Sequence, residues 1–353
     1  MVNVRLWSAL ILLTASAFAV RPGDFKVIGP GGGGAMFNPT ISPHDPNTVL
    51  ISCDMSGSYI SHNGGQSWRM FNLRGVVRFF TFDPLDPKVM YAQATGLWRS
   101  TDGGENWNLV YPSPEKIKAI VMRSDHADED LVTDESPTDL LTAMAIDPAD
   151  SKTLYGVGDK SHPALFISRD SGKTWSRQDD LPETPRRIWV DPKSPRDSRT
   201  LYMAGKHFVS VKDTSGLHNF AAPESVTLTD VSGGFNSGSQ PVVYGVSDRG
   251  VFVSKDGGRT WQPSTLPGSE GKVRAVGASL RNGNVAYVSF SDLLLDGKKW
   301  MGVAKTENAG DSWQLVWKES DSAAPNVHDG WITYRFGVGW GENPLEIGVA
   351  DQD

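Results

Sequence analysis

The chain has almost no cysteine: Cys53 is the only one among its 353 residues. A single thiol excludes an internal disulfide framework, so packing alone must stabilise the fold. The seven histidines include no pair at metal-ligand spacing. Gly31 to Gly34 are followed neither by Lys-Ser/Thr nor by a helical pattern, which argues against a phosphate-binding loop. We therefore expect neither a metal site nor a cofactor.

Positive charge is also scarce. The 41 acidic residues outnumber the 34 basic ones, the net charge is -7, and no basic run stands out. This balance argues against nucleic acid or an anionic membrane as a partner. Glycine (37), proline (22) and tryptophan (12) are plentiful instead. Such a composition is typical of many short strands joined by tight turns rather than of long helices.

The N-terminus has the pattern of a targeting segment. Arg5 supplies a positive start, Leu6 to Ala15 is apolar, and Ala17-Phe18-Ala19 is an A-x-A cleavage site. The apolar stretch is short for a membrane span, although a retained anchor is the alternative. We expect residues 1–19 to be a signal peptide and the mature chain, from Val20, to be secreted into the extracellular space or the periplasm.

One eight-residue turn motif occurs five times, with the pattern Ser/Thr-x-Asp/Asn-x-Gly-x-Ser/Thr/Asn-Trp. The Asp or Asn oxygen bonds backbone N–H groups within the turn, and the glycine takes the positive φ that the turn needs. The Trp begins the next strand and packs between sheets. The five copies are residues 61–68, 100–107, 168–175, 254–261 and 306–313.

A second repeat precedes these turns and contains Asp-Pro or a related dipeptide between two apolar runs. Because Asp-Pro cannot continue a central strand, it marks a turn between two strands. We call the eight-residue turn the box. One four-stranded antiparallel unit, as in a β-propeller blade, follows the order strand, Asp-Pro turn, strand, short turn, strand, box and Trp strand. The repeats are "ISPHDPNTVLI" from 41, "FDPLDPKVMYA" from 82, "IDPADSKTLYG" from 146 and "VDPKSPRDSRTLYM" from 190.

The sequence therefore predicts an all-β fold, a β-propeller with six complete blades and a truncated seventh that begins near Val327. The fourth blade has a decayed box at Lys212 to Ser215, and the acidic stretch 123–136 interrupts the third as a solvated loop or, alternatively, a calcium site. We expect residues 20–353 to be the N-terminal propeller of two, and a monomer. The predicted blades are 37–75, 76–113, 117–183, 185–222, 224–267 and 272–319.

These repeats resemble the Asp-box (BNR) propellers, which include sialidases, sortilin-type receptors, photosystem assembly factors and tandem-propeller xyloglucanases. The sialidase Arg-Ile-Pro segment is missing before the first box. The N-terminal region is more similar to the endoglucanases of glycoside hydrolase family 74. The resemblance is carried by Gly31 to Gly34, by "FNPTISPHDPNTVLIS" and by Cys53 to Tyr59.

This resemblance implies an inverting glycoside hydrolase in which Asp54 is the catalytic base. Ser56 departs from the glycine that the family usually has there. The alternative role of Asp54 is to cap the Ser56-Gly57-Ser58 turn through backbone bonds. Inverting hydrolysis also needs a carboxylic acid about 6.5–9.5 Å away, and "LEIGVADQD" echoes the Asp54 segment with Asp351 in the corresponding place. The alternative is an acid beyond residue 353.

Aromatic side chains outside the boxes are the candidate sugar platforms, because sugar rings stack their C–H faces on Trp and Tyr. The box tryptophans are expected in the core. The predicted function is hydrolysis of a polysaccharide or oligosaccharide such as xyloglucan. The alternatives are a non-catalytic propeller that binds a glycan or protein partner, or a sialidase-like enzyme. The platform candidates are Tyr59, Trp331, Tyr334 and Trp340.

Overall fold

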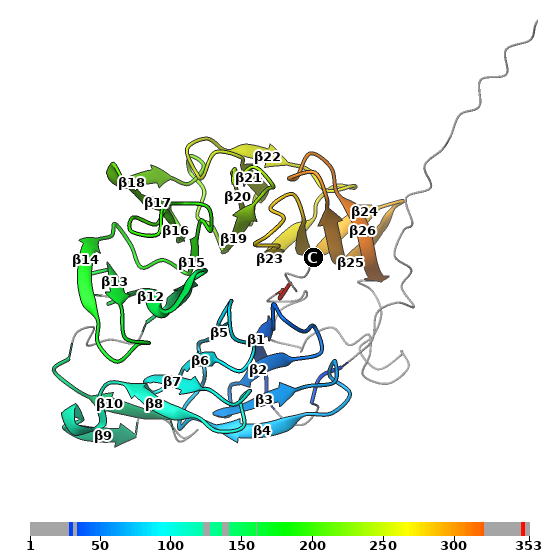
Figure 1. The fold of residues 1–353 in the computed structure, drawn as a ribbon. Coiled ribbons are helices and arrows are strands. Elements are labelled where there is room, and N and C mark those ends of the chain that lie inside the picture. Colours follow the sequence, from blue (N-terminus) through cyan, green and yellow to red (C-terminus); the bar gives the residue numbers. More distant parts are fainter. Residues whose placement is uncertain are drawn as a thin grey trace, which may run out of the picture.

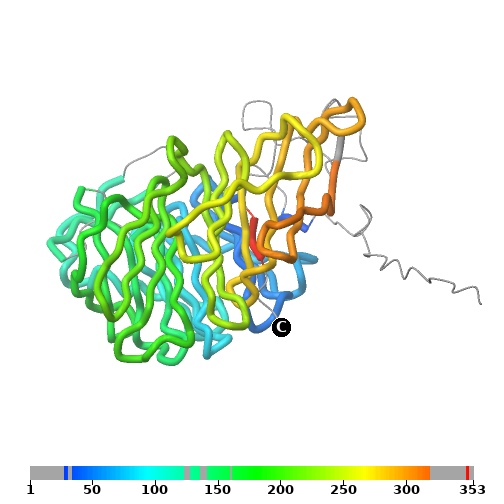
Figure 2. The backbone as a smooth tube through the Cα atoms, turned by 90° about the horizontal axis from the view of Figure 1, so that it is seen from above, coloured from blue at the N-terminus to red at the C-terminus, as the bar shows by residue number. Residues whose placement is uncertain are grey.

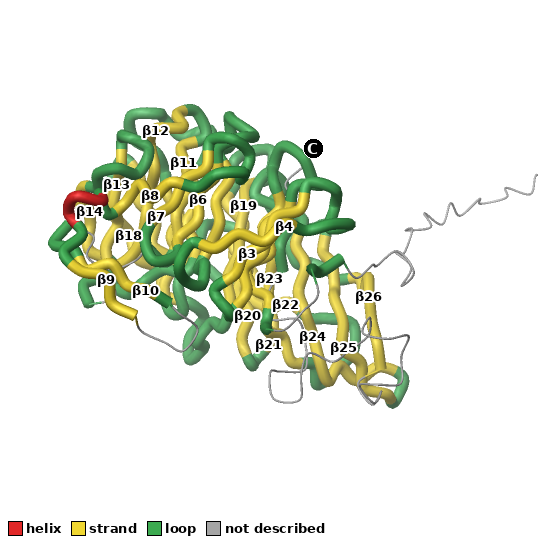
Figure 3. Tube along the Cα trace, turned by 90° about the horizontal axis from the view of Figure 1, so that it is seen from below, coloured by secondary structure: helices red, strands yellow, loops and turns green. Residues whose placement is uncertain are grey.

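The structure is a computed structural model and describes residues 28–30, 34–122, 128–135, 141–159, 161–320 and 347–349. These residues form six four-stranded antiparallel sheets arranged as blades around a centre (Figure 1). A two-stranded sheet and one short 3-10 helix, η2 (Pro114–Lys116), complete the described elements. The views from above and below show no helical layer over either face (Figure 2, Figure 3). The predicted all-β propeller is confirmed.

In every blade the strands follow chain order from the centre outward. Blades one to three are β1 (Met36–Ile41), β2 (Val49–Cys53), β3 (Gly57–Ser61), β4 (Arg69–Asn72); β5 (Phe79–Phe82), β6 (Met90–Gln93), β7 (Leu97–Ser100), β8 (Asn108–Tyr111); and β11 (Ala143–Asp147), β12 (Asp150–Gly158), β13 (Ala164–Ser168), β14 (Ser176–Asp180). Blades four to six are β15 (Arg187–Val190), β16 (Leu201–Ala204), β17 (Phe208–Asp213), β18 (Gly216–Ala221); β19 (Asp230–Phe235), β20 (Pro241–Ser247), β21 (Gly250–Ser254), β22 (Gln262–Ser264); and β23 (Lys272–Ala278), β24 (Ala286–Leu295), β25 (Lys298–Thr306), β26 (Gln314–Ser320).

The prediction for the third blade is wrong at its start. Its sheet begins at Ala143 rather than at residue 117, because β9 (Ala119–Met122) and β10 (Glu129–Val132) pair with each other as a separate hairpin. Apolar cross-strand neighbours such as Ile120 and Leu131 favour that pairing. The acidic stretch therefore precedes the blade instead of interrupting it, and part of it is a strand rather than a loop.

The described end of the chain lies between the first and last blades. A Cβ added to Gly277 of β23 would lie 2.8 Å from Ile347 Cγ2 and 3.0 Å from Val349 Cγ2. On the other side, Gly348 lies against the Pro39 carbonyl of β1. Residues 347–349 therefore bridge the inner strands of blades six and one (Figure 1). The rest of the predicted seventh blade lies outside the described residues.

The box turns share one hydrogen-bond pattern. The Ser or Thr hydroxyl that opens each box accepts the N–H of the box glycine at 2.7–3.0 Å. The Asp or Asn Oδ1 accepts the N–H four residues on at 2.9 Å. Blade four has a tight turn instead, in which Ser215 N–H donates to Asp213 Oδ1 at 2.8 Å. The five predicted boxes and the decayed one are thus confirmed.

The core lies between neighbouring blades. Leu50 and Ile60 of blade one pack against Phe80 and Met90 of blade two, and similar apolar clusters fill the junctions from blade two through blade six. The second to fifth boxes also touch the preceding blade: a Cβ on Gly104, for example, would lie 2.7 Å from Ile60 Cδ1, so only glycine fits. The predicted core position of the box tryptophans is confirmed for those packed against these clusters, namely Trp107, Trp175, Trp261 and Trp313.

No helix in the described part of the chain is both long and apolar enough to cross a membrane.

Candidate functional site

The propeller has two distinct faces, because turns alternate between the ends of antiparallel strands. We call the "Asp54 face" the one that carries the turns between second and third strands, and the "box face" the one that carries the box turns. Cys53, the last residue of β2, pairs with Met36, the first residue of β1. Asp54 follows directly and is half-buried on the first of these faces. Its place at a turn beside the innermost strand puts it near the channel rim.

The segment before β1 holds Asp54 at two points. Asp54 N–H donates to the Ala35 carbonyl oxygen at 3.1 Å. In return, Ala35 N–H donates to Asp54 Oδ1 at 2.9 Å. Within the described residues, no hydrogen bond joins the N–H groups of 56–58 to this carboxylate, so the alternative role of turn cap is not what the geometry shows. Asp54 is bound by its neighbouring strand rather than by its own turn.

The only cysteine of the chain also contacts this carboxylate. Burial raises the pKa of the Cys53 thiol, so the thiol is protonated at neutral pH. Its Sγ lies 3.5 Å from Asp54 Oδ1, a distance at which a thiol donates a weak hydrogen bond. The Ala35 N–H and the Cys53 thiol both contact Oδ1 of Asp54, and Oδ2 has no hydrogen-bond partner among the described residues. The carboxylate is therefore anchored through one oxygen and leaves the other available.

Ser56 shows how the departure from glycine is accommodated. Its φ is 61°, in the left-handed region that favours glycine. Holding a non-glycine residue in this conformation costs about 1 kcal/mol. The Ser56 hydroxyl is buried and accepts from Asn72 Nδ2 at 3.4 Å. The serine ties the Asp54 turn to the end of β4.

A chain of contacts runs from this turn to the β9–β10 hairpin. The N–H of Arg74 donates to Asn72 Oδ1 at 2.6 Å, and Arg74 Nε lies 2.7 Å from Glu129 Oε2 of β10. Asp128 Oδ1 accepts the N–H of Val76 at 3.2 Å. The hairpin therefore stands on the Asp54 face as a side wall. The sequence repeats do not indicate this wall, although the acidic stretch lies at its position.

The acidic residues of the hairpin bind groups of the protein itself. Glu129 pairs with Arg74, Asp134 with Lys118, and Glu135 accepts the N–H of Ser113. In the parts of the chain that the structure describes, no group of three or more His, Cys, Asp or Glu side chains is placed to hold a metal ion.

Of the other predicted site residues, Tyr59 alone lies within the part of the chain that the structure describes. Tyr59 is half-buried in β3, where it pairs with Ile51 on one side and Met70 on the other. It therefore lies two residues into the strand that follows the Asp54 turn. The remaining four residues lie outside the described residues, so their roles stay predictions: Asp351, Trp331, Tyr334 and Trp340.

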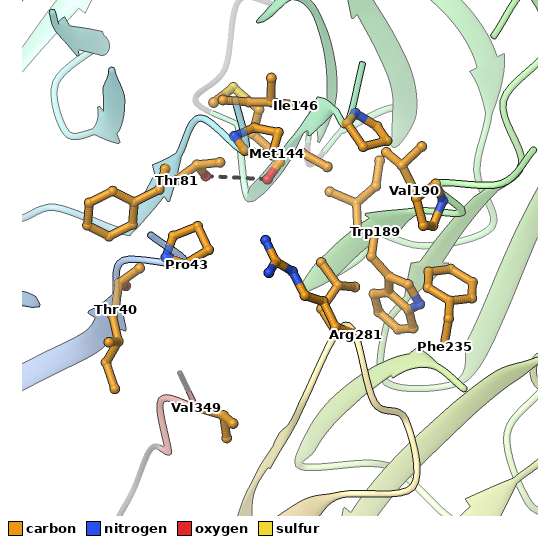
Figure 4. A pocket seen from close by; sticks show the side chains of 18 of the residues that line it. Thr40, Pro43, Thr81, Met144, Ile146, Trp189, Val190, Phe235, Arg281 and Val349 are labelled. Carbon is orange, nitrogen blue, oxygen red and sulfur yellow. Dashed lines mark hydrogen bonds between the residues drawn. The ribbon is translucent and has the colours of Figure 1, made fainter. Parts of the chain in front are cut away.

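A cavity of about 660 Å³ opens at the other end of the channel. Its wall is formed by the ends of inner strands and the prolines that follow them, and the side chain of Arg281 points into it (Figure 4). Val349 lines it as well. The cavity is lined by Pro39 to Ile41 of β1, whereas Asp54 contacts Ala35, just before β1 begins. The cavity and Asp54 therefore lie at opposite ends of β1, roughly 15 Å apart. The cavity is therefore no part of the Asp54 site.

Three comparisons relate the chain to known proteins. The BNR/Asp-box repeat family model matches residues 252–263, the stretch around the fourth box. A xyloglucanase of Paenibacillus sp. is 26% identical over 88% of this chain and 29% of its own length. Xyloglucanase Xgh74A of Acetivibrio thermocellus is 25% identical over 82% of this chain and 34% of its own length. The chain thus spans about a third of these relatives.

Among solved structures, YCF48 from Cyanidioschyzon merolae aligns with a TM-score of 0.54 at 13% identity, covering 82% of this chain and 87% of that one. YCF48 bound to D1 peptide aligns with a TM-score of 0.51 at 13% identity, over 80% of this chain and 82% of that one. At this identity the likeness concerns the fold alone.

Proposed function

We propose that this Asp-box β-propeller, similar in sequence to xyloglucanases, is part of a secreted glycoside hydrolase that cleaves a β-glucan such as xyloglucan. The observation that carries the proposal is Asp54, which lies half-buried beside the innermost strand and is bound by Ala35 rather than by its own turn. The similarity to xyloglucanases over 82–88% of the chain supports the substrate class.

The proposed reaction is inverting hydrolysis with Asp54 as the general base. Oδ2 removes a proton from a water molecule while the water oxygen attacks the anomeric carbon. The glycosidic C–O bond breaks on the opposite side of the sugar, and a carboxylic acid protonates the departing oxygen. One new C–O bond thus replaces the glycosidic one, and the anomeric configuration inverts.

The second carboxyl group is the less defined half of the proposal. It must lie about 6.5–9.5 Å from Asp54 to leave room for the water. Asp351 is the candidate within this chain, and an acid from a further part of the protein is the alternative.

Substrate would lie across the Asp54 face, with the β9–β10 hairpin along one side. Tyr59, Trp331, Tyr334 and Trp340 are the proposed stacking platforms. The box tryptophans do not compete for this role, since those packed in the blade junctions cannot present a ring face to a sugar.

The test is to express the complete gene product and assay it on xyloglucan, mixed-linkage β-glucan and cellulose. Proton NMR of the first-formed reducing ends reports the anomer. We expect hydrolysis of at least one β-glucan with the α-anomer formed first. A β-anomer first would contradict the inverting mechanism. Glycan or protein binding without any hydrolysis would instead support the binding-module alternative. Mass spectrometry of the exported protein tests whether the mature chain begins near Val20.

A further inference from the structure

We infer that Gly34 and Ala35 are positioning residues for Asp54: together they fix which carboxylate oxygen faces the reacting water. The inference rests on the proposed function of Asp54. Neither residue touches substrate in the mechanism above, so both act through the carboxylate.

Ala35 supplies the hydrogen bonds. Its carbonyl accepts from Asp54 N–H at 3.1 Å and its N–H donates to Oδ1 at 2.9 Å. The first bond fixes the backbone of Asp54, and the second fixes the rotation of the carboxylate. The Cys53 thiol, 3.5 Å from the same oxygen, adds a third contact. With Oδ1 held this way, Oδ2 is the oxygen that takes the proton.

Gly34 provides the space. Its φ is 96°, a conformation that side chains rarely adopt. A Cβ there would lie 2.5 Å from Asp54 Oδ1, 2.7 Å from Cys53 Sγ and 3.0 Å from Met55 Cγ. Ordinary contact needs 3.4 Å or more, so an alanine would displace the carboxylate by roughly 1 Å. A shift of that size near a reacting group lowers a rate by about 10²-fold.

The experiment compares Gly34→Ala with Gly250→Ala in the complete gene product. Gly250 begins β21 on the same face, has a φ of 115°, and a Cβ there would meet nothing within 4 Å. Both variants therefore carry the same kind of backbone strain, and only one disturbs a carboxylate. We expect Gly34→Ala to lower kcat on xyloglucan about 100-fold with KM changed less than about threefold. Gly250→Ala should keep kcat within about threefold at a similar loss of Tm.

If Gly34→Ala fails to fold, Ala35→Pro perturbs the same carboxylate, because it removes the N–H donor to Oδ1 and places the proline Cδ against that oxygen. A fall in kcat equal to that of Gly250→Ala, or a rise in KM alone, would overturn the inference.

The Asp54→Asn variant separates this failure from failure of the proposed function. If Asp54→Asn is inactive while Gly34→Ala and Gly250→Ala behave alike, the positioning inference fails alone. If Asp54→Asn is as active as the wild type, the proposed function fails and the inference falls with it.

Discussion

Replacing the box aspartate Asp256 by alanine should destabilise the propeller without changing its chemistry. Asp256 Oδ1 accepts from Ser254 Oγ at 2.7 Å and from Thr260 N–H at 2.9 Å, and Oδ2 accepts from Thr260 Oγ1 at 2.6 Å. Ser254 is fully buried, so its hydroxyl would lose its acceptor. Three partly exposed bonds and one unsatisfied buried donor together cost about 2–3 kcal/mol. For a domain of this size that lowers Tm by roughly 3–5 °C.

The matched control is Asp256→Asn. Two natural boxes use asparagine: Asn63 and Asn308 accept the same backbone N–H at 2.9 Å, and their Nδ2 donates to a serine hydroxyl. The Thr260 hydroxyl can turn to accept in the same way, so we expect a cost below about 0.5 kcal/mol. Calorimetry gives the Tm of the wild type, Asp256→Ala and Asp256→Asn, and an activity assay gives the rate per folded molecule of each. Equal Tm for Ala and Asn, or lost activity at normal Tm, would refute the reasoning.

Two further predictions concern charge. Backbone and side-chain hydrogen bonds from Asn106, with one from Ser100, lower the pKa of Asp102 from 3.8 to about 2. The stability that the Asp102 carboxylate contributes is therefore complete above pH 3.8 and disappears as the pH falls through about 2. The gap in urea midpoint between wild type and Asp102→Ala should narrow over that range, and a gap independent of pH would contradict this. The buried Arg199–Asp147 pair, with Nε 2.7 Å from Oδ2, joins blades three and four. Arg199→Ala should lower the free energy of unfolding in urea by about 3–5 kcal/mol. Arg177 forms an exposed pair with Asp180, so Arg177→Ala should lower it by less than about 1 kcal/mol. Similar losses for the two variants would show that the buried pair contributes no more than the exposed one.

Much of the fold could be predicted because its signals are local. Each box satisfies its own turn within about seven residues, so the pattern alone locates the outer two strands of a blade. The Asp-Pro dipeptides locate the inner two for the same reason. The β9–β10 hairpin carries neither signal, and its strands are held by short apolar pairs such as Ile120 with Leu131. Its separation from blade three was therefore not predictable from the repeats.

The surroundings of Asp54 depend on contacts that are distant in the sequence. The Ala35–Asp54 bonds span 19 residues and require the β1–β2 register, which shifts between Phe37 and Thr40. No pattern in the sequence indicates that shift. The same holds for the path from Asn72 through Arg74 to Glu129, which spans 57 residues from 72 to 129. Sequence patterns could thus identify Asp54 as a candidate, whereas its anchoring by Ala35 and the hairpin beside it required the structure.

The most direct test of the central claim is the hydrolysis rate of Asp54→Asn in the complete gene product. Asparagine keeps an Oδ1 that accepts the Ala35 N–H but cannot take a proton from water. We expect the rate on xyloglucan to fall by about 10²–10⁴-fold, while Tm and the affinity for xyloglucan oligosaccharides stay near those of the wild type. A rate equal to that of the wild type would show that Asp54 is not the base.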